Sequence, residues 1–118
     1  MPRIERGSVW LANLDPGRGT EPGKTRPVLV VQSQALLDAG HPCTLVVPLT
    51  TRLIEDAEPL RLRLKAFGRL KKDSDLLIDQ LRAIDNRRLA AAPLGRAGEA
   101  FMQKVSAAIA DAMDLRLA

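Results

Sequence analysis

Short runs of apolar residues, broken by glycine, proline and charged residues, fill most of the chain before residue 95. In Val9 to Leu14 the side chains alternate between two faces, and Trp10, Ala12 and Leu14 share one of them. Arg26 to Gln32 is an almost unbroken β-branched run, which is typical of a strand covered on both faces. Both segments are therefore predicted to be strands.

Three further segments extend the predicted sheet. Thr44 to Leu49 is a third strand, in which Pro48 limits pairing near the end. In Leu60 to Lys65 leucine alternates with arginine and lysine, which predicts a half-buried strand with a basic outer face. That basic row is usually solvated, and phosphate binding is the alternative. Leu76 to Ile84 is predicted to form one or two strands after a turn or hairpin that begins at Gly68.

Helical signals are confined to three places. Ser33 to Ala39 favours a short helix, capped by Ser33 and stopped by Gly40, and Asn86 to Leu89 favours one helical turn. From Glu99 to Leu115 the apolar period becomes helical. The apolar stripe of that helix consists of Phe101, Val105, Ile109 and Met113, with Ala108 and Ala112 beside them.

The order of these elements predicts a mainly β fold with a C-terminal helix. Several short strands followed by one helix favour a small, strongly bent antiparallel sheet or partly open barrel, against which the helix packs. Parallel βαβ units are not expected, because only one connection before the last is long enough for even a short helix. A chain of 118 residues predicts a single domain over residues 1–118.

Charge and aromatic content narrow the range of partners. The chain has 18 Lys and Arg against 14 Asp and Glu, a net charge of +4, and a pI near 9.8. This balance is compatible with a polyanionic partner such as a nucleic acid. The aromatic residues are Trp10, Phe67 and Phe101 alone, so a platform on which bases stack is not expected, and positive charge would have to carry more of the binding.

The cysteine and histidine counts exclude several kinds of site. Cys43 is the only cysteine and His41 the only histidine, so an intramolecular disulfide and a cluster of soft zinc ligands are excluded. No metal and no cofactor are expected. No apolar run reaches membrane-spanning length and no export signal is recognisable, so we expect a cytoplasmic protein without membrane contact.

Several motifs, in the same order along the chain, resemble the MazF/PemK family of toxins. They are RGSVWLANLDPGRGTEPGKTRPVLVV near the start, VVPLTT at Val46 to Thr51, DSDLLIDQLRAID at Asp73 to Asp85, and the final helix. The resemblance implies an SH3-like or PemK-type barrel of five to seven antiparallel strands with one long and one or two short helices. It also implies a homodimeric toxin of a type II toxin–antitoxin system.

The activity and partner that the resemblance implies are specific. Members of the family cleave single-stranded RNA, chiefly mRNA, at short sequences without a metal ion. Their usual partner is a MazE-like antitoxin, whose acidic, disordered tail folds along the basic groove. Two other classes stay open: a CcdB-like gyrase-binding toxin without nuclease activity, which is similar in fold, and a non-catalytic RNA-binding module.

The resemblance also assigns roles to residues by their position in the motifs. Arg26 falls on the arginine of the R-P motif and Thr50 on the threonine that ends the third strand, which makes them the catalytic pair. The residues implied to lie near the RNA are Glu21, Lys24, Thr51, Asp79, Gln80 and Arg82. Simpler roles compete with these: Arg26 could merely pair with Glu21, and a strand-end threonine commonly satisfies a turn. Asp79 could equally orient Arg82 as a cross-strand partner.

Arg26 and Thr50 suit the chemistry of RNA cleavage through the 2′-hydroxyl. That reaction needs in-line geometry, stabilisation of charge at phosphorus, and proton transfers at two oxygens. The planar guanidinium of Arg26 can bind two phosphoryl oxygens and stays charged, so it is assigned electrostatic stabilisation, with proton donation to the leaving oxygen left open. Thr50 could donate a hydrogen bond to the same phosphate. Because His41 is the only histidine, a two-imidazole mechanism is excluded and a broad pH dependence is expected.

Overall fold

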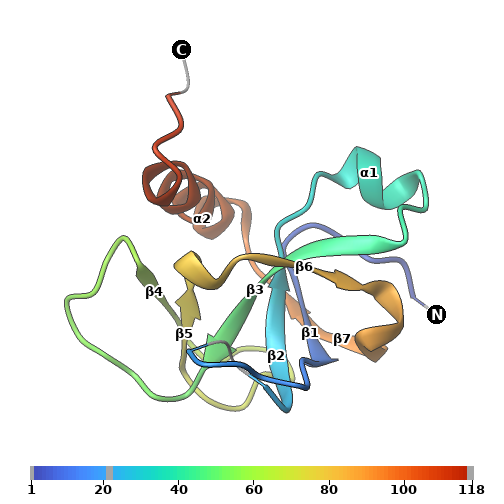
Figure 1. Ribbon diagram of the computed structural model, residues 1–118, viewed down its shortest axis with the longest axis horizontal. Coiled ribbons are helices and arrows are strands. Elements are labelled where there is room, and N and C mark those ends of the chain that lie inside the picture. The colour runs from blue at the N-terminus through green and yellow to red at the C-terminus, as the bar shows by residue number, and fades with distance from the viewer. Residues whose placement is uncertain (1, 21–22, 117–118) are drawn as a thin grey trace.

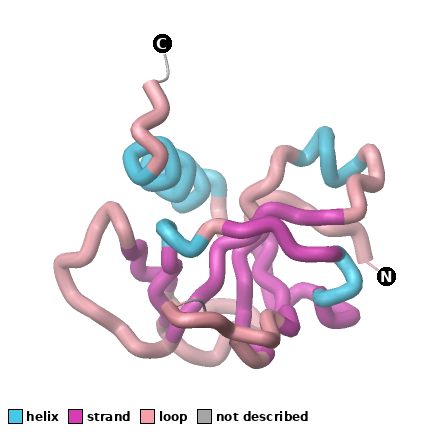
Figure 2. The backbone as a smooth tube through the Cα atoms, in the orientation of Figure 1, coloured by secondary structure: helices cyan, strands magenta, loops and turns pink. Residues whose placement is uncertain are grey.

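The computed structural model describes residues 2–20 and 23–116 (Figures 1 and 2). The strands are β1 (Ser8–Asn13), β2 (Thr25–Val30), β3 (Cys43–Thr50), β4 (Arg61–Leu64), β5 (Ser74–Leu77), β6 (Arg82–Asp85) and β7 (Leu89–Arg96). The helices are α1 (Gln34–Asp38) and α2 (Glu99–Ala112), with the one-turn 3₁₀ helices η1 (Ile78–Gln80) and η2 (Asn86–Arg88). The predicted mainly β fold with a long C-terminal helix is confirmed.

The strands form one antiparallel sheet in the order β4-β5-β3-β2-β1-β7, with β6 also paired to β3. β3 is the centre of this sheet, because it pairs with β2 along one edge and with both β6 and β5 along the other. Its β6 ladder ends at Val46 and its β5 ladder begins at Leu49. Pro48, which has no N–H to donate, lies in the gap between them, as the sequence predicted.

The bent sheet encloses two apolar clusters. One contains Val9, Leu29 and Val47, and α2 covers it with Met102, Val105 and Ala108. The other lies on the opposite side of β1 and contains Trp10, Ala12 and Leu14 together with residues of β6 and β7. The predicted alternation of faces along β1 is therefore confirmed. Figure 1 shows α2 lying over one end of the sheet, where it contacts η1.

Local signals explain most of the element boundaries. The Ser33 hydroxyl accepts a hydrogen bond from the Leu36 N–H at 3.3 Å, which begins α1, and Gly40 follows the helix with a φ of 78°. The predicted strand or strands of Leu76 to Ile84 become β5, η1 and β6, so the chain turns at η1 to leave one ladder of β3 and join another.

Two expectations from the sequence were wrong. β7 was not predicted, because LAAAPLGR is rich in alanine and contains proline and glycine, which disfavour strands; it forms the edge next to β1, where a proline is tolerated. The helix ends at Ala112, and Met113, assigned to its apolar stripe, is 56% exposed. Met102, which the stripe omitted, is buried against the sheet.

Candidate active site

Arg26 and Thr50 lie across from each other on the two central strands. β2 and β3 run antiparallel with Val28 opposite Pro48. The ladder ends at this pair, and Arg26 and Thr50 each lie two residues beyond it on their own strand. Opposed residues point to the same face of a sheet, so the arginine and threonine side chains face the same solvent-accessible region.

Both side chains line one open pocket of about 480 Å³. Its walls come from the loop before β2, the ends of β2 and β3, the start of β4, and the end of β5. The lining residues are Thr20, Gly23, Arg26, Thr50, Thr51, Arg52, Arg61 and Leu77. Three of these residues are arginines and none carries a carboxylate, so the pocket favours an anionic ligand.

A backbone carbonyl holds the Arg26 side chain. Its Nε donates to the Gly23 carbonyl at 3.0 Å, which leaves the two Nη groups at the outer end of the guanidinium. Within residues 2–20 and 23–116 no carboxylate forms an ion pair with Arg26. The charge of this guanidinium is thus directed at the pocket and is not neutralised by a described neighbour.

Glycine is required at residue 23 for this arrangement. A Cβ on Gly23 would lie 2.8 Å from the Gly17 nitrogen and 2.9 Å from a carboxylate oxygen of Asp15. The two arms of this loop lie so close together at Gly23 that there is no room for a side chain. The glycine therefore allows the carbonyl that orients Arg26 to reach its position.

Thr50 keeps its hydroxyl proton available. Its Oγ1 accepts a hydrogen bond from the Arg52 N–H at 3.2 Å, so the turn role considered as an alternative is present. That bond uses only an oxygen lone pair, and the hydroxyl can still donate its hydrogen to a ligand in the pocket. The structural and the chemical roles of Thr50 are compatible.

The loop that precedes β2 is closed at its base. The Leu14 N–H donates to the Lys24 carbonyl at 2.8 Å, and the Lys24 N–H donates to the Asp15 carboxylate. Arg88 Nη1 donates to the Asn13 carbonyl at 3.0 Å and to the Asp15 carbonyl at 2.8 Å. Glu21, predicted to lie near the RNA from this loop, falls outside the described residues.

The other predicted RNA-binding residues are divided between neighbouring surfaces. Lys24 lines a smaller hollow of about 240 Å³, together with Arg26 and Thr51. Asp79 and Gln80 line a hollow of about 400 Å³ that adjoins the main pocket and shares Thr20, Arg61 and Leu77 with it. Six of the predicted residues, Lys24, Arg26, Thr50, Thr51, Asp79 and Gln80, therefore lie along one continuous surface.

Arg82 is placed differently from Asp79 and Gln80. It begins β6 opposite Val46, and it lines neither the main pocket nor the two hollows beside it. Its Nη1 is buried and makes no hydrogen bond. In the described part of the chain no ion pair joins Asp79 to Arg82, so the cross-strand pairing considered for them is absent.

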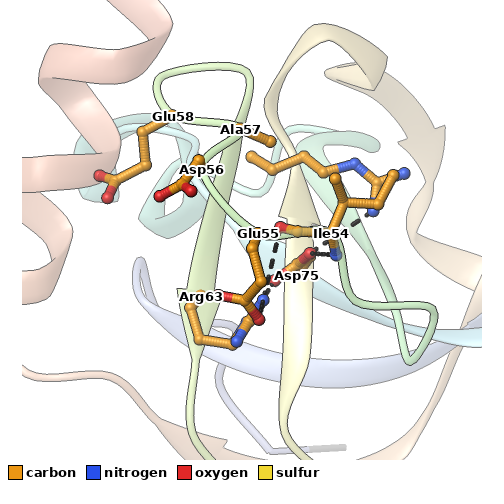
Figure 3. A pocket seen from close by; sticks show the side chains of 8 residues that line it. Ile54, Glu55, Asp56, Ala57, Glu58, Arg63 and Asp75 are labelled. Carbon is orange, nitrogen blue, oxygen red and sulfur yellow. Dashed lines mark hydrogen bonds and ion pairs between the residues drawn. The ribbon is translucent and has the colours of Figure 1, made fainter.

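Sequence patterns missed a buried carboxylate, Asp75 on β5, which lines another hollow next to the main pocket (Figure 3). Its side chain is 1% exposed. Arg63 Nε donates to Oδ1 at 2.6 Å, the Ile54 N–H donates to Oδ2 at 2.9 Å, and Arg61 Nη1 lies 3.5 Å from Oδ2. The basic row of β4 is therefore not a freely solvated face, because Asp75 holds two of its arginines.

The environment of Asp75 keeps this carboxylate ionised. Burial opposes ionisation, but the hydrogen bonds from Arg63 and the Ile54 N–H, together with the charge of Arg63, outweigh it and hold the pKa of Asp75 below its usual value. A buried acid was invisible to sequence analysis because DSDLL resembles a polar turn. The alternation of Arg61 and Arg63 was the one signal that could have located it, since such a row needs an acidic partner when half-buried.

Two further features of the described residues bear on the site. In residues 2–20 and 23–116 no three His, Cys, Asp or Glu side chains are placed to hold a metal ion together. Across the same ranges no helix is long and apolar enough to span a membrane.

The family profile for PemK-like, MazF-like toxins of type II toxin–antitoxin systems matches residues 5–113. The chain belongs to this family. Toxins of the MazF/PemK family are endoribonucleases, so the surface formed by Arg26 and Thr50 lies in a protein whose family activity is RNA cleavage.

Solved structures of MazF toxins have the same fold. The Mycobacterium tuberculosis toxin MazF-mt6 is 23% identical with a TM-score of 0.75, over 93% of this chain and 99% of that one. MazF from Deinococcus radiodurans is 23% identical with a TM-score of 0.79, over 97% and 99%. An endoribonuclease in complex with its cognate antitoxin, from a mycobacterial species, is 22% identical with a TM-score of 0.74, over the whole of both chains.

Proposed function

We propose that this MazF/PemK toxin cleaves single-stranded RNA at a phosphodiester bound between Arg26 and Thr50. The observation that carries the proposal is their convergence, from two strands, on one open pocket whose described lining residues include three arginines and no carboxylate. A phosphate is the ligand that such a pocket suits, because a guanidinium binds two phosphoryl oxygens at once. The single domain expected over residues 1–118 is part of this proposal.

The RNA itself supplies the nucleophile in the proposed reaction. The 2′-oxygen attacks the adjacent phosphorus, a new P–O2′ bond forms, and the P–O5′ bond breaks, which leaves a 2′,3′-cyclic phosphate and a 5′-hydroxyl. One proton leaves the 2′-hydroxyl and one reaches the 5′-oxygen. Negative charge grows on the non-bridging oxygens in between, and Arg26 and Thr50 stabilise it there. No metal ion enters this scheme.

The surface next to the pocket can accommodate the RNA on one side of the scissile phosphate. The hollow lined by Asp79 and Gln80 continues from the pocket across Thr20, Arg61 and Leu77. Amide and carboxylate side chains can hydrogen-bond the edges of unpaired bases, which is how single strands of RNA are read. We therefore assign Asp79 and Gln80 to base contacts, Lys24 to phosphate contact, and Thr51 to the wall beside the scissile bond.

The partners proposed for this toxin follow its family. MazE–MazF complexes from Deinococcus radiodurans and an endoribonuclease bound to its cognate antitoxin are among its structural neighbours. A homodimeric, cytoplasmic toxin restrained by a MazE-like antitoxin is the matching proposal here. An acidic antitoxin tail would be attracted to the arginines of the pocket and compete with RNA.

A CcdB-like gyrase-binding toxin is the second candidate function, and a non-catalytic RNA-binding module is the third. Neither needs a hydroxyl next to the arginine. The pairing of Arg26 with a threonine whose proton is available favours the nuclease over both.

The experiment that tests the proposal incubates purified protein with mixed-sequence RNA in EDTA and maps the new ends. We expect cuts at a recurring short sequence, with 5′-hydroxyl ends, from the wild type. Arg26→Ala and Thr50→Val should each slow cleavage by about 10²- to 10³-fold, as losing one transition-state donor does. Arg87→Ala is the matched control, because the Arg87 side chain is 91% exposed and, among the described residues, forms an ion pair with Asp85 alone.

Three results would contradict the proposal. They are intact RNA after incubation with the wild type, full dependence on an added metal ion, and wild-type rates in folded Arg26→Ala protein. Circular dichroism of each variant separates a loss of chemistry from a loss of folding. Binding of RNA without its cleavage would favour the non-catalytic RNA-binding module. Inhibition of gyrase without cleavage of RNA would favour the CcdB-like gyrase-binding toxin.

A further inference from the structure

Arg61 lies where three hollows of this surface meet. It lines the pocket that holds Arg26 and Thr50, the hollow that holds Asp79 and Gln80, and a third hollow of about 370 Å³ beneath the β3–β4 loop. A strand of RNA passing from the scissile phosphate toward Asp79 and Gln80 would cross the junction that Arg61 forms with Thr20 and Leu77. The sequence left phosphate binding open for the basic row of β4 that includes Arg61, but it did not assign Arg61 a place beside the RNA.

The contacts of Arg61 fix its position at one end. Nη1 donates to the Arg52 carbonyl at 2.9 Å and approaches Asp75 Oδ2 at 3.5 Å. Among the described residues these are the hydrogen bonds of the Arg61 side chain, and both use the same nitrogen. Nε and Nη2 are left to donate elsewhere, and the side chain is 22% exposed.

Four carboxylates line the third hollow, and another arginine binds two of them, Asp75 and Glu55. Arg63 donates from Nε to Asp75 at 2.6 Å and from Nη2 to Glu55 at 3.1 Å, as Figure 3 shows. Arg61 has only the long contact to Asp75. Its charge is therefore less compensated than that of Arg63, although the two arginines lie two residues apart on the same face of β4.

We propose that Arg61 binds a backbone phosphate of the RNA adjacent to the scissile one, and that Asp75 is the residue that positions it. This inference rests on the proposed function, because it deepens the same site. Asp75 ties the Ile54 N–H and Arg61 to β5, and Arg61 in turn ties the Arg52 carbonyl. The start of the β3–β4 loop and the arginine are thereby fixed together at the pocket wall.

A merely structural role for Arg61 is the competing explanation. In that role Arg61 only holds the β3–β4 loop in place through its hydrogen bond to the Arg52 carbonyl, and Arg61 does not contact RNA. Arg63 offers a matched comparison, because it contacts the same carboxylate, also contacts the loop, and does not line the pocket of Arg26 and Thr50. Substitution of either arginine disturbs the Asp75 cluster, but only one substitution should remove a phosphate contact.

The test measures how binding of a short, random-sequence single strand depends on salt concentration. A strand with 2′-deoxyribose throughout keeps the phosphates and cannot be cut through a 2′-hydroxyl. For single strands, the slope of log affinity against log salt is about −0.7 per phosphate neutralised. Arg61→Gln should therefore make the slope shallower by about 0.7, Arg61→Lys should restore it, and Arg63→Gln should leave it unchanged.

The outcomes separate this inference from the proposed function. Two results would overturn the proposed phosphate contact of Arg61: an unchanged slope in folded Arg61→Gln protein, or equal changes of slope for Arg61→Gln and Arg63→Gln. A purely structural role of Arg61 would explain either result. A shallower slope for Arg61→Gln alone supports the phosphate contact even if the wild type fails to cut RNA, and that failure would count only against the nuclease. A cutting enzyme with an unchanged slope would keep the nuclease and lose the Arg61 contact.

Discussion

At the scale of single residues, the proposed site consists of a permanently charged guanidinium, Arg26, and a hydroxyl group, Thr50. Arg26 is oriented by one backbone carbonyl, and Thr50 is oriented by one backbone N–H. Neither needs a titrating partner to be active, which agrees with a chain that has one histidine. A guanidinium is a poor base near neutral pH, so its contribution is to hold charge as the phosphorus is attacked.

Arg26→Lys tests whether the forked shape of the guanidinium matters as well as its charge. A lysine keeps the positive charge but cannot bind two phosphoryl oxygens in one plane. The loss of one charge-assisted hydrogen bond, about 1.5–3 kcal/mol, predicts a cleavage rate lower by about tenfold to a hundredfold. Single-turnover cleavage of an RNA that carries the mapped site measures this. A rate equal to that of the wild type would mean that charge alone suffices.

Asp75 predicts a pH dependence of stability. Its pKa in the folded protein is lowered, so it stabilises the fold above the pKa of the unfolded chain, about 3.9, and this contribution disappears as pH falls through the lower folded value. Asp75→Asn should lower the free energy of unfolding at pH 7 by about 1–3 kcal/mol, since Arg63 loses its buried partner. Urea unfolding at pH 7 and at pH 3 should show the difference shrinking in acid.

Asp85 provides the comparison for that experiment. Its hydrogen bonds from the Arg87 side chain and N–H lower the pKa of Asp85 to about 2, but it lies at the surface. Asp85→Asn should change stability less than Asp75→Asn at pH 7, because solvent screens an exposed pair. A larger effect at Asp85 would show that the buried carboxylate is not the stronger anchor.

At the scale of elements, the loop before β2 sets the position of Arg26. The two ends of this loop are joined at Leu14 and Lys24, and the Gly23 carbonyl holds the guanidinium. The sequence predicted a junction between a loop and a buried strand here, because glycine and proline give way abruptly to valine. It could not predict which carbonyl would meet Arg26, because that depends on the path of the loop.

Gly23→Ala tests the role of this loop. The new Cβ would meet the Gly17 nitrogen at 2.8 Å, so the loop must shift and the carbonyl that holds Arg26 must shift with it. Cleavage should slow by about tenfold or more, while the free energy of unfolding should change by about 1 kcal/mol or less, as is usual for a surface loop. Gly98→Ala is the control, because no atom lies within 4 Å of a Cβ built there. Equal rates for the two variants would contradict this role.

Sequence periodicity predicted strands where β-branched residues alternate and failed where they do not. β1 to β6 and α1 arise from local patterns, turns and caps that are visible in the sequence. β7 arises from pairing with β1 and the packing of Leu89, so its alanines adopt an extended shape that their propensity does not favour. The same limit applies to Asp75, whose importance depends on which strands lie beside β5.

At the scale of the whole molecule, α2 closes the larger apolar cluster against the bent sheet. Met102 is 8% exposed and Met113 is 56% exposed, although the periodicity alone assigned only Met113 to the buried stripe. Met102→Ala should lower the free energy of unfolding by about 2–5 kcal/mol. Met113→Ala should change it by about 0.5 kcal/mol or less. Urea unfolding of both variants decides this, and similar losses would contradict the observed packing of α2.

The fold brings the predicted catalytic residues together because the β2–β3 ladder ends with Val28 opposite Pro48, and Arg26 and Thr50 each lie two residues beyond that pair. A one-residue slip would send one of these side chains to the other face and abolish the pocket. The family motifs predicted both residues, but they did not predict Arg52 and Arg61, which come from the β3–β4 loop and β4 and complete the basic wall.

A double-mutant cycle on single-turnover RNA cleavage tests most directly whether Arg26 and Thr50 act on one phosphate. The rates of the wild type, Arg26→Ala, Thr50→Val and the double variant are compared in EDTA, with folding checked for each. Because the two groups stabilise the same charge, the double variant should lose much less than the product of the two single losses. Single losses that multiply, or a wild-type rate in either single variant, would contradict a shared catalytic site.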